Sequence, residues 1–137
     1  MDLAARERPF GCPPDIELHF PPPPSVNHIW RRTKAGKRAV YCSPEYMAWK
    51  RASDALMFNL AQLRGVRPLP AQFEATIVLC EKRVNLDLDN APKAVLDYAK
   101  KALLIVDDGK RYMRDLRVTW GDAPHGCRLI LRPREPN

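Results

Sequence analysis

The chain has 137 residues, of which 45% are hydrophobic and 28% are charged, a composition that indicates one globular domain and excludes a wholly disordered protein. The 23 Lys and Arg outnumber the 16 Asp and Glu, and this formal net charge of +7 favours a polyanionic partner such as nucleic acid over a basic surface that serves only solubility. No apolar run approaches the roughly 20 residues of a membrane helix, and the charged start "MDLAARERPFG" lacks the apolar core of a secretion signal, so we expect a cytoplasmic protein without a membrane partner.

The N-terminal part predicts a tail, a short strand and a basic hairpin. Residues 1–14 are expected to form a flexible tail, which leaves a single domain over residues 15–137. "IELHF" at 16–20 alternates as a strand does, and the four prolines at 21–24 end it because proline donates no ladder hydrogen bond. "RRTKAGKR" at 31–38 places five cations around a glycine and predicts a basic β-hairpin or a flexible loop.

A first helix is predicted from residue 44 to residue 63. Ser43 is a good N-cap residue, and Pro44 fits the first helical position. Gly65 is expected to end the helix. Its apolar residues predict the face that meets the core, namely Met47, Ala48, Ala52, Ala55, Leu56, Leu60 and Leu63.

A second helix is predicted from about residue 90 to residue 102. Asp89 is expected to cap it, and Pro92 fits only its first turn. The clearest strand precedes this helix at 71–81, and closing strands are predicted at 112–120 and 127–133. The apolar face of the helix consists of Ala91, Ala94, Val95, Tyr98, Ala99 and Ala102.

The order of these elements is strand, hairpin, helix, strand, helix, strand, strand. It predicts a small α+β domain with a mixed or mostly antiparallel sheet and two main helices. Four cysteines occur without the paired spacing of a zinc finger, so the sequence gives no support for a zinc site. Three of them lie in apolar, strand-like surroundings and are predicted to be reduced core residues: Cys42, Cys80 and Cys127.

Two aspartates, Asp87 and Asp89, stand two residues apart within "VNLDLDNAPKAV", just before the second helix. Carboxylates are common at helix starts, where they meet free N–H groups, so capping alone explains one of them. Alternate residues of an extended segment lie on one side, and two convergent carboxylates suit Mg²⁺ or Mn²⁺. The pattern leaves capping and metal binding open.

Lys93 follows Asp89 by four residues, which places the two side chains on one helix face. The pair is either a surface ion pair worth a few tenths of a kcal/mol or part of a phosphodiester-cleaving site. In such a site a metal ion activates water, and a nearby cation stabilises the charge that develops in the transition state. Lys93 therefore shifts the balance towards a metal site.

A second acidic pair, Asp107 and Asp108, precedes Gly109 in a sequence that is typical of a turn. The second helix is roughly 20 Å long, and residues 103–107 would span about 17 Å if extended. The chain can therefore fold back and bring Asp107 or Asp108 near Asp89 of the same subunit. A dimer could instead supply the acid from its partner chain.

The stretch "LDLDNAPKAVLDYAKKALLIVDDGKRYMRDLRV" resembles the RusA family of Holliday-junction resolvases. It shares with that family an Asp-Leu-Asp-Asn box, a lysine four residues after the second Asp, an Asp within the helix and a later Asp-Asp pair. "FPPPPSVNHIWRR" resembles the Pro-Pro-Ser-x-Asn box of the family, and "VYCSPEYMAWKRASDALM" is similar to its segment leading into the first helix. The resemblance covers about residues 16–133.

This resemblance implies a homodimeric, Mg²⁺-dependent endodeoxyribonuclease, with Mn²⁺ able to substitute, that resolves four-way DNA junctions by paired phosphodiester hydrolysis in recombination and repair. It implies that Asp87, Asp89 and Asp108 hold the metal and that Lys93 acts with them in catalysis. It also implies a RusA-like fold in a cytoplasmic, nucleoid-associated protein of a prokaryote or a phage. Two alternatives remain: a non-catalytic DNA-binding homologue, and a nuclease that acts on other branched DNA.

The cations between residues 31 and 38 are predicted to contact the DNA backbone. An asparagine and a tryptophan just before them are expected to help shape the junction centre, and two further cations precede the acidic box. The predicted DNA-binding residues are Asn27, Trp30, Arg31, Arg32, Lys34, Lys37, Arg38, Lys82 and Arg83.

Overall fold

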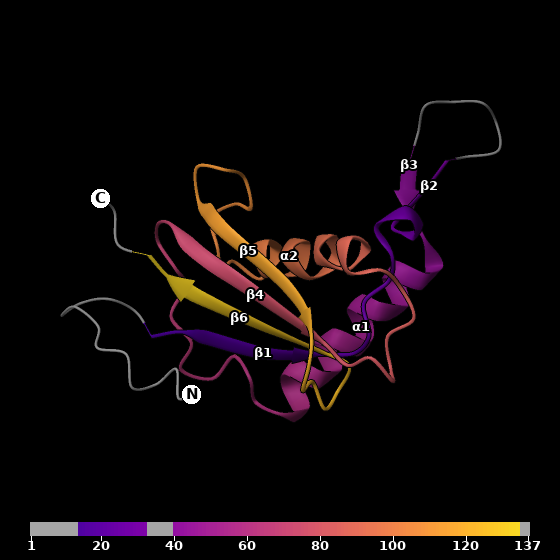
Figure 1. Ribbon diagram of the computed structural model, residues 1–137, viewed down its shortest axis with the longest axis horizontal. Helices are drawn as coiled ribbons and strands as arrows, with labels where there is room; N and C mark the ends of the chain where they lie inside the picture. The colour runs from indigo at the N-terminus through magenta and orange to yellow at the C-terminus, as the bar shows by residue number, and fades with distance from the viewer. Residues whose placement is uncertain (1–13, 33–39, 135–137) are drawn as a thin grey trace.

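A computed structural model of the chain describes residues 14–32 and 40–134 (Figure 1). The predicted N-terminal tail, residues 1–14, lies outside the described residues except for its last residue. In chain order, the described elements are β1 (Ile16–Phe20), the short 3₁₀ helix η2 (Val26–His28), β2 (Trp30–Arg32), β3 (Val40–Cys42), α1 (Pro44–Asn59), β4 (Phe73–Leu79), the 3₁₀ helix η3 (Leu88–Asn90), α2 (Pro92–Lys101), β5 (Met113–Trp120) and β6 (Cys127–Pro133).

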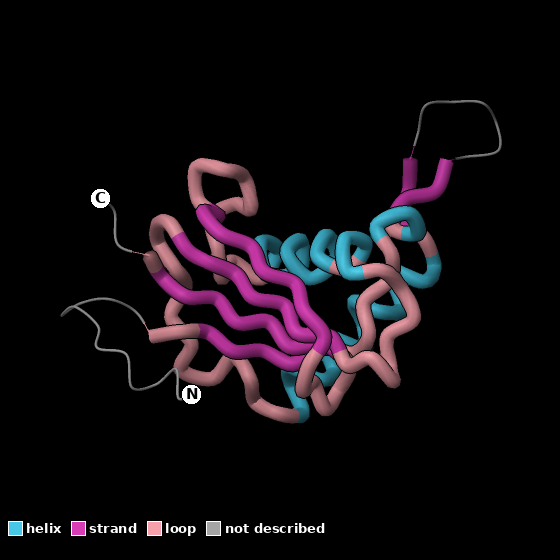
Figure 2. The backbone as a smooth tube through the Cα atoms, viewed as in Figure 1, coloured by secondary structure: helices cyan, strands magenta, loops and turns pink. Residues whose placement is uncertain are grey.

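The main sheet has four strands in the order β1-β6-β4-β5. Strands β4 and β5 are parallel and are joined through α2, whereas β6 pairs with both β1 and β4 in the antiparallel sense. Both helices lie on one face of this sheet, behind it in the view of Figure 1 and Figure 2. The predicted α+β domain with a mixed sheet and two main helices is therefore confirmed.

The segment predicted as a basic β-hairpin or a flexible loop is flanked by two paired strands. Strand β2 pairs antiparallel with β3, with Trp30 opposite Cys42 and Arg32 opposite Val40. Figure 1 shows these two strands projecting from the body of the molecule just before α1 begins. Residues 33–39, which include Lys34, Lys37 and Arg38, lie outside the described residues.

The core forms between the helices and the covered face of the sheet. Leu18, Leu129 and Ile77 stand side by side on β1, β6 and β4, and all three are fully buried. Burying a side chain of this size stabilises the fold by about 1.5–3 kcal/mol. Phe20 continues this layer, since its ring packs edge-on against Tyr98 of α2 at a centroid distance of 5.2 Å.

Helix α1 begins where predicted, but it buries a different face. The Ser43 hydroxyl accepts a hydrogen bond from the N–H of Tyr46 at 3.1 Å, and the helix ends at Asn59, not at residue 63. Its buried residues are Tyr46, Trp49, Ser53 and Met57. The seven predicted core positions are exposed or, at Leu56, only half-buried, because two aromatic rings bury more apolar area than a row of alanines.

The prediction of reduced core cysteines holds in full for Cys127, whereas Cys80 lies outside the buried core. Cys127 is buried and Cys80 is half-buried, and both are free thiols. Burial raises the pKa of Cys127 to about 12, so its thiol stays protonated at neutral pH. The side chain of Cys42 lies outside what the structure describes.

Gly126 lies so close to Pro22 of the proline segment that there is no room for a side chain. Its φ is 120°, and an added Cβ would lie 2.6 Å from Cδ and 2.8 Å from N of Pro22. Neither atom belongs to a flexible side chain, so we expect Gly126→Ala to lower the free energy of unfolding by about 2 kcal/mol or more, measured by urea denaturation. Gly65→Ala is the matched control, because Gly65 has φ 70° but no atom within 4 Å of such a Cβ. Equal losses in both variants would contradict the contact with Pro22.

Candidate active site

The two aspartates of the acidic box do not cap the helix that follows them. Asp87 precedes η3 without a side-chain capping hydrogen bond, and Asp89 lies within that turn. The cap position of α2 is occupied by Ala91, and Pro92 is its first residue. The prediction that Asp89 caps the helix is therefore wrong, because the 3₁₀ turn moves the cap position two residues beyond it, to Ala91.

Asp87 and Asp89 are both exposed. Neither side chain forms a hydrogen bond or a salt bridge with any residue that the structure describes. Strand β5 contacts η3, and so does α2, so this turn sits where the edge strand and the helix meet. The box thus presents two free carboxylates at the surface, next to the first turn of α2.

Lys93 is the second residue of α2, and its ammonium faces two carboxylates. Its Nζ lies 3.1 Å from Oδ1 of Asp97 and 4.0 Å from Oδ2 of Asp108. Its salt bridges among the described residues do not include Asp89, so the alternative of a simple surface pair between Lys93 and Asp89 is wrong.

The chain folds back after α2 and brings Asp108 to Lys93 of the same subunit. The helix ends at Lys101, and Leu103 adopts a left-handed φ of 61°, a position that glycine usually occupies. The N–H of Leu104 then donates to the carbonyl of Ala99 at 3.0 Å, which closes the helix end. This reversal returns Asp108 to Lys93 at the start of the helix in the same chain. The expected approach of Asp107 or Asp108 to Asp89 stays a prediction.

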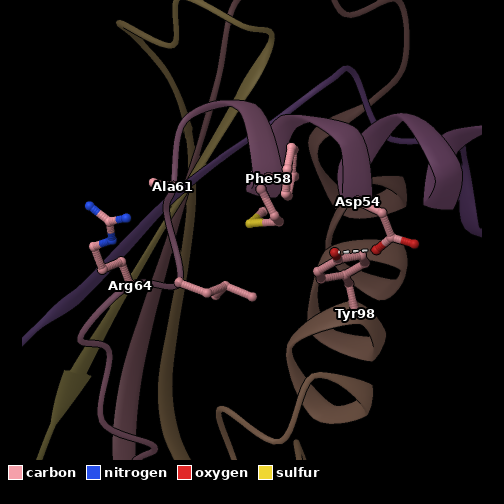
Figure 3. Close-up of a pocket in the computed structure, with 7 residues that line it drawn as sticks. Asp54, Phe58, Ala61, Arg64 and Tyr98 are labelled. Carbon is pink, nitrogen blue, oxygen red and sulfur yellow. Dashed lines mark hydrogen bonds between the residues drawn. The ribbon is translucent and has the colours of Figure 1, made fainter.

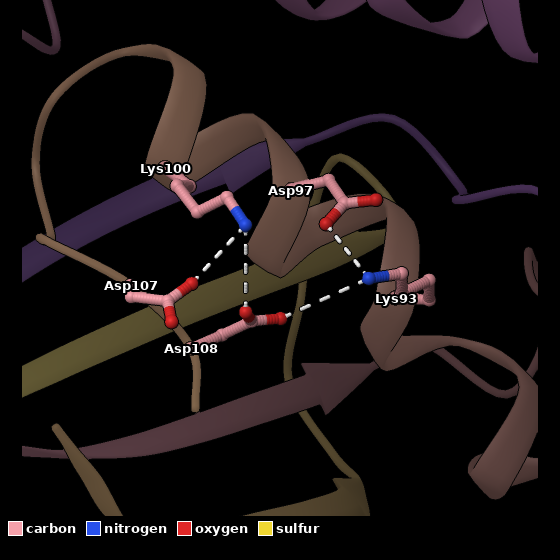
Figure 4. A network of polar contacts seen from close by, with 5 residues as sticks. All are labelled: Lys93, Asp97, Lys100, Asp107 and Asp108. Atoms are coloured by element: carbon pink, nitrogen blue, oxygen red, sulfur yellow. Dashed lines mark hydrogen bonds and ion pairs between the residues drawn. The ribbon is translucent and has the colours of Figure 1, made fainter. Parts of the chain in front are cut away.

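A second lysine holds the returning turn (Figure 4). Nζ of Lys100 lies 3.1 Å from Oδ1 of Asp107 and 3.8 Å from Oδ1 of Asp108. The hydrogen bond between Lys100 and Asp107 raises the pKa of Lys100 and lowers the pKa of Asp107. Both groups are therefore charged at neutral pH, and Lys100 fixes the turn that presents Asp108.

Asp97 and Lys100 were not among the predicted site residues. With Lys93 they form a row at positions i, i+4 and i+7, which lie on one helix face. That spacing is readable in the sequence, but the acids that the lysines contact come from a loop. Only the fold-back of residues 102–108 brings Asp107 and Asp108 to the lysines of this row.

A family model described as Endodeoxyribonuclease RusA matches residues 19–125, which is most of the chain. The chain belongs to the RusA endodeoxyribonuclease family. The matched region contains the acidic box, Lys93 and the later acidic pair, so the polar cluster of Figure 4 lies within the part that this RusA-family chain shares with its family. No curated protein matches the chain.

The described DNA-binding candidates of this RusA-family chain fall in two places. Asn27 is exposed in η2, which contacts α2, and the backbone of residues 30–32 continues from η2 into the hairpin. Lys82 and Arg83 are exposed in the turn after β4, where the N–H of Arg83 donates to the carbonyl of Cys80 at 3.0 Å. Among the described residues, no helix is long and apolar enough to cross a membrane.

The predicted metal ligands fit a hard cation by chemistry but are not gathered into a closed site. Within residues 14–32 and 40–134, no three His, Cys, Asp or Glu side chains form a group that could hold an ion. The carboxylates of Asp87, Asp89 and Asp108 supply the oxygen ligands that Mg²⁺ prefers. Two of them have no competing partner, and the side chain of Asp108 is 21% exposed. Asp108 itself faces Lys93 and Lys100, so the three acids do not form a preassembled metal site among the described residues.

An apolar pocket lies elsewhere, between the end of α1 and α2 (Figure 3). It has a volume of about 580 Å³, and the hydroxyl of Tyr98 donates to Oδ1 of Asp54 at 2.5 Å on its wall. Burial and this hydrogen bond raise the pKa of Tyr98. None of the predicted site residues of the RusA-family chain lines the pocket, whose lining is Asp54, Met57, Phe58, Ala61, Leu63, Arg64 and Tyr98.

Proposed function

We propose that this RusA-family chain is a Mg²⁺-dependent endonuclease that resolves four-way DNA junctions, with Mn²⁺ able to replace Mg²⁺. One observation carries the proposal: within one chain, the fold-back after α2 brings Asp108 to 4.0 Å from Lys93, next to the segment with the two free carboxylates of Asp87 and Asp89. A helix cap or a simple turn does not require a contact between Lys93 and Asp108.

In the proposed mechanism, Asp87, Asp89 and Asp108 would hold the ion. The bound ion would lower the pKa of a water molecule and polarise a phosphate oxygen. Lys93 then places its ammonium near the scissile phosphate, where it compensates the negative charge that develops as the water attacks. The exposed position of these groups suits a phosphodiester that belongs to a large substrate and cannot enter a closed pocket.

The charge of the protein supports the approach of DNA. The net charge of +7 attracts phosphates and releases their counterions, although the catalytic groups themselves are largely acidic. Resolution of a junction requires cuts in two strands of like polarity. A homodimer with two-fold symmetry presents two identical sites for these cuts, so we propose the dimer as the active form.

The test offers purified protein and Mg²⁺ to a synthetic four-way junction, a flap and a linear duplex of matched sequence. We expect paired nicks in the junction, little cleavage of the duplex and no cleavage in EDTA. Equal cleavage of the flap and the junction would indicate a nuclease that acts on branched DNA in general and not on four-way junctions in particular. Tight binding to the junction without cleavage would instead indicate a non-catalytic DNA-binding homologue.

The basic hairpin should supply much of the salt-dependent affinity. Replacing Arg31 and Arg32 with Ala removes two cations that we assign to backbone phosphates. Junction binding should therefore weaken, and the slope of log Kd against log salt concentration should decrease by about 2. Fluorescence anisotropy in EDTA at several salt concentrations measures both quantities. The double variant Arg111→Ala, Arg114→Ala is a matched loss of charge at the start of β5, and an equal change in slope there would contradict a special role for the hairpin.

A further inference from the structure

Asp97 has no part in the mechanism above, yet it is the nearest ionic partner of Lys93. The distance from Nζ of Lys93 is 3.1 Å to Asp97, compared with 4.0 Å to Asp108. The Asp97 side chain is 14% exposed, whereas that of Lys93 is 45% exposed. The carboxylate is thus the more confined member of the pair, and the long lysine side chain reaches towards it (Figure 4).

The stability of the helix does not explain a lysine at position 93. The residue lies in the first turn of α2, and that turn carries no acidic residue. A cation in this position faces the positive end of the helix dipole, which disfavours it. A lysine that precedes its acid by four residues is also the weaker order for an ion pair along a helix. The placement is therefore better explained by the position that the ammonium reaches.

We propose that Asp97 is a positioning residue that holds the Lys93 ammonium beside Asp108 without letting it close on that carboxylate, an inference that rests on the proposed function. One oxygen of Asp108, Oδ1, already faces Lys100 at 3.8 Å. If Lys93 moved onto Oδ2, lysines would occupy both oxygens of Asp108, and a metal ion would have to displace them. Asp97 thus leaves Oδ2 of Asp108 free to bind a metal ion and leaves the Lys93 ammonium free to contact the phosphate.

Asp97→Asn should therefore change catalysis in two ways. The single-turnover rate at saturating Mg²⁺ should fall by about 10- to 100-fold, as is usual for groups that orient catalytic residues. The Mg²⁺ concentration at half-maximal rate should rise, since Lys93 then competes for Asp108. Asp97→Glu should restore part of both, because it keeps the charge. Glu17→Gln is the matched control, because it also neutralises the acid of an ion pair. Glu17 of β1 pairs with Arg128 of β6 at 3.5 Å, and both residues are far from the proposed site in the sequence.

Two further measurements separate positioning from a structural role. In a Lys93→Met background, Asp97→Asn should cause no additional loss of rate, because its effect acts through Lys93. In protein without metal or DNA, an amine-acylating reagent followed by mass spectrometry should modify Lys93 several-fold faster in Asp97→Asn than in the wild type. Lys101, which is exposed at the end of the same helix, should react equally in both proteins.

The outcomes distinguish this inference from the proposed function. Wild-type protein that cuts no DNA would refute the proposed function, while the acylation rates would still report whether Asp97 holds Lys93. A cutting enzyme in which Asp97→Asn leaves the rate and the Mg²⁺ midpoint unchanged would overturn the inference alone. A loss of rate that follows a fall in melting temperature, or that adds to the loss in Lys93→Met, would also overturn it, because Asp97 would then act on the fold.

Discussion

Asp89→Asn should abolish junction cleavage without unfolding the protein. The substitution removes a proposed metal ligand, and because even groups behind the ligands cost about 10- to 100-fold when lost, the cleavage rate should fall by more than about 100-fold. Asp89 is exposed and does not cap α2, so the free energy of unfolding should change by less than about 0.5 kcal/mol. Junction affinity in EDTA should be unchanged or tighter, because a negative charge near phosphate is lost.

The same experiment applies to the other acids. Asp87→Asn and Asp108→Asn should behave as Asp89→Asn does. Asp107→Asn is the matched control: it removes one carboxylate from the same turn, and we expect a milder effect because Asp107 is held by Lys100 rather than directed to Lys93. If Asp107→Asn alone abolished cleavage, the assignment of Asp108 as the ligand would be wrong. A large loss of stability in Asp89→Asn would indicate that Asp89 supports the fold and would contradict its assignment as a metal ligand.

Lys93→Ala should reduce the single-turnover cleavage rate by about 100-fold or more, which is typical when a group that stabilises transition-state charge is lost. Lys93 is a half-exposed surface lysine, with 45% of its side chain accessible, so its loss should change stability by only a few tenths of a kcal/mol. Lys93→Arg is the sharper variant. Arginine keeps the charge but is longer and planar, so a site that requires a compact ammonium should not accept it.

Lys101→Ala provides the control for Lys93, because it removes one exposed lysine from the same helix. Its cleavage rate should stay near that of the wild type. Junction affinity should fall far less than the rate in both Lys93 variants, since one contact among many phosphates contributes little to binding. A near-normal rate in Lys93→Ala would remove Lys93 from the active site and leave only the aspartates.

Strands β1, β4 and β6 were predictable because every second residue along most of each strand is buried on one face of the sheet, whereas the edge strand β5 has no fully buried residue. Ile16–Phe20 matches its predicted bounds, and the other three strands of the sheet fall within theirs or begin one residue later. The core face of α1 was not predictable from apolar spacing alone. Tyr46 and Trp49 determine which face of α1 is buried. The Nε1–H of Trp49 also donates to the carbonyl of Pro21 at 3.0 Å, a partner that only the folded chain provides.

The candidate site was predictable only in part, because its two halves are joined by backbone geometry. The box aspartates, Lys93 and the later acidic pair follow from composition and spacing. The 3₁₀ turn that frees Asp89 from capping depends on Pro92 entering the helix at its first position. The roles of Asp97 and Lys100 depend on Leu103, whose left-handed backbone conformation turns the loop back towards the helix. The spacing of apolar residues does not predict that conformation.

If acids of this basic protein hold the ion required for DNA cleavage, as we claim, diffraction from crystals soaked in Mn²⁺ should locate that ion. The anomalous signal of Mn²⁺ locates the ion without reference to activity. We predict one ion per chain, bound by the carboxylates of Asp87, Asp89 and Asp108, and none at this position in Asp89→Asn crystals. The absence of Mn²⁺ from these carboxylates, at a concentration that supports junction cleavage in solution, would contradict the claim.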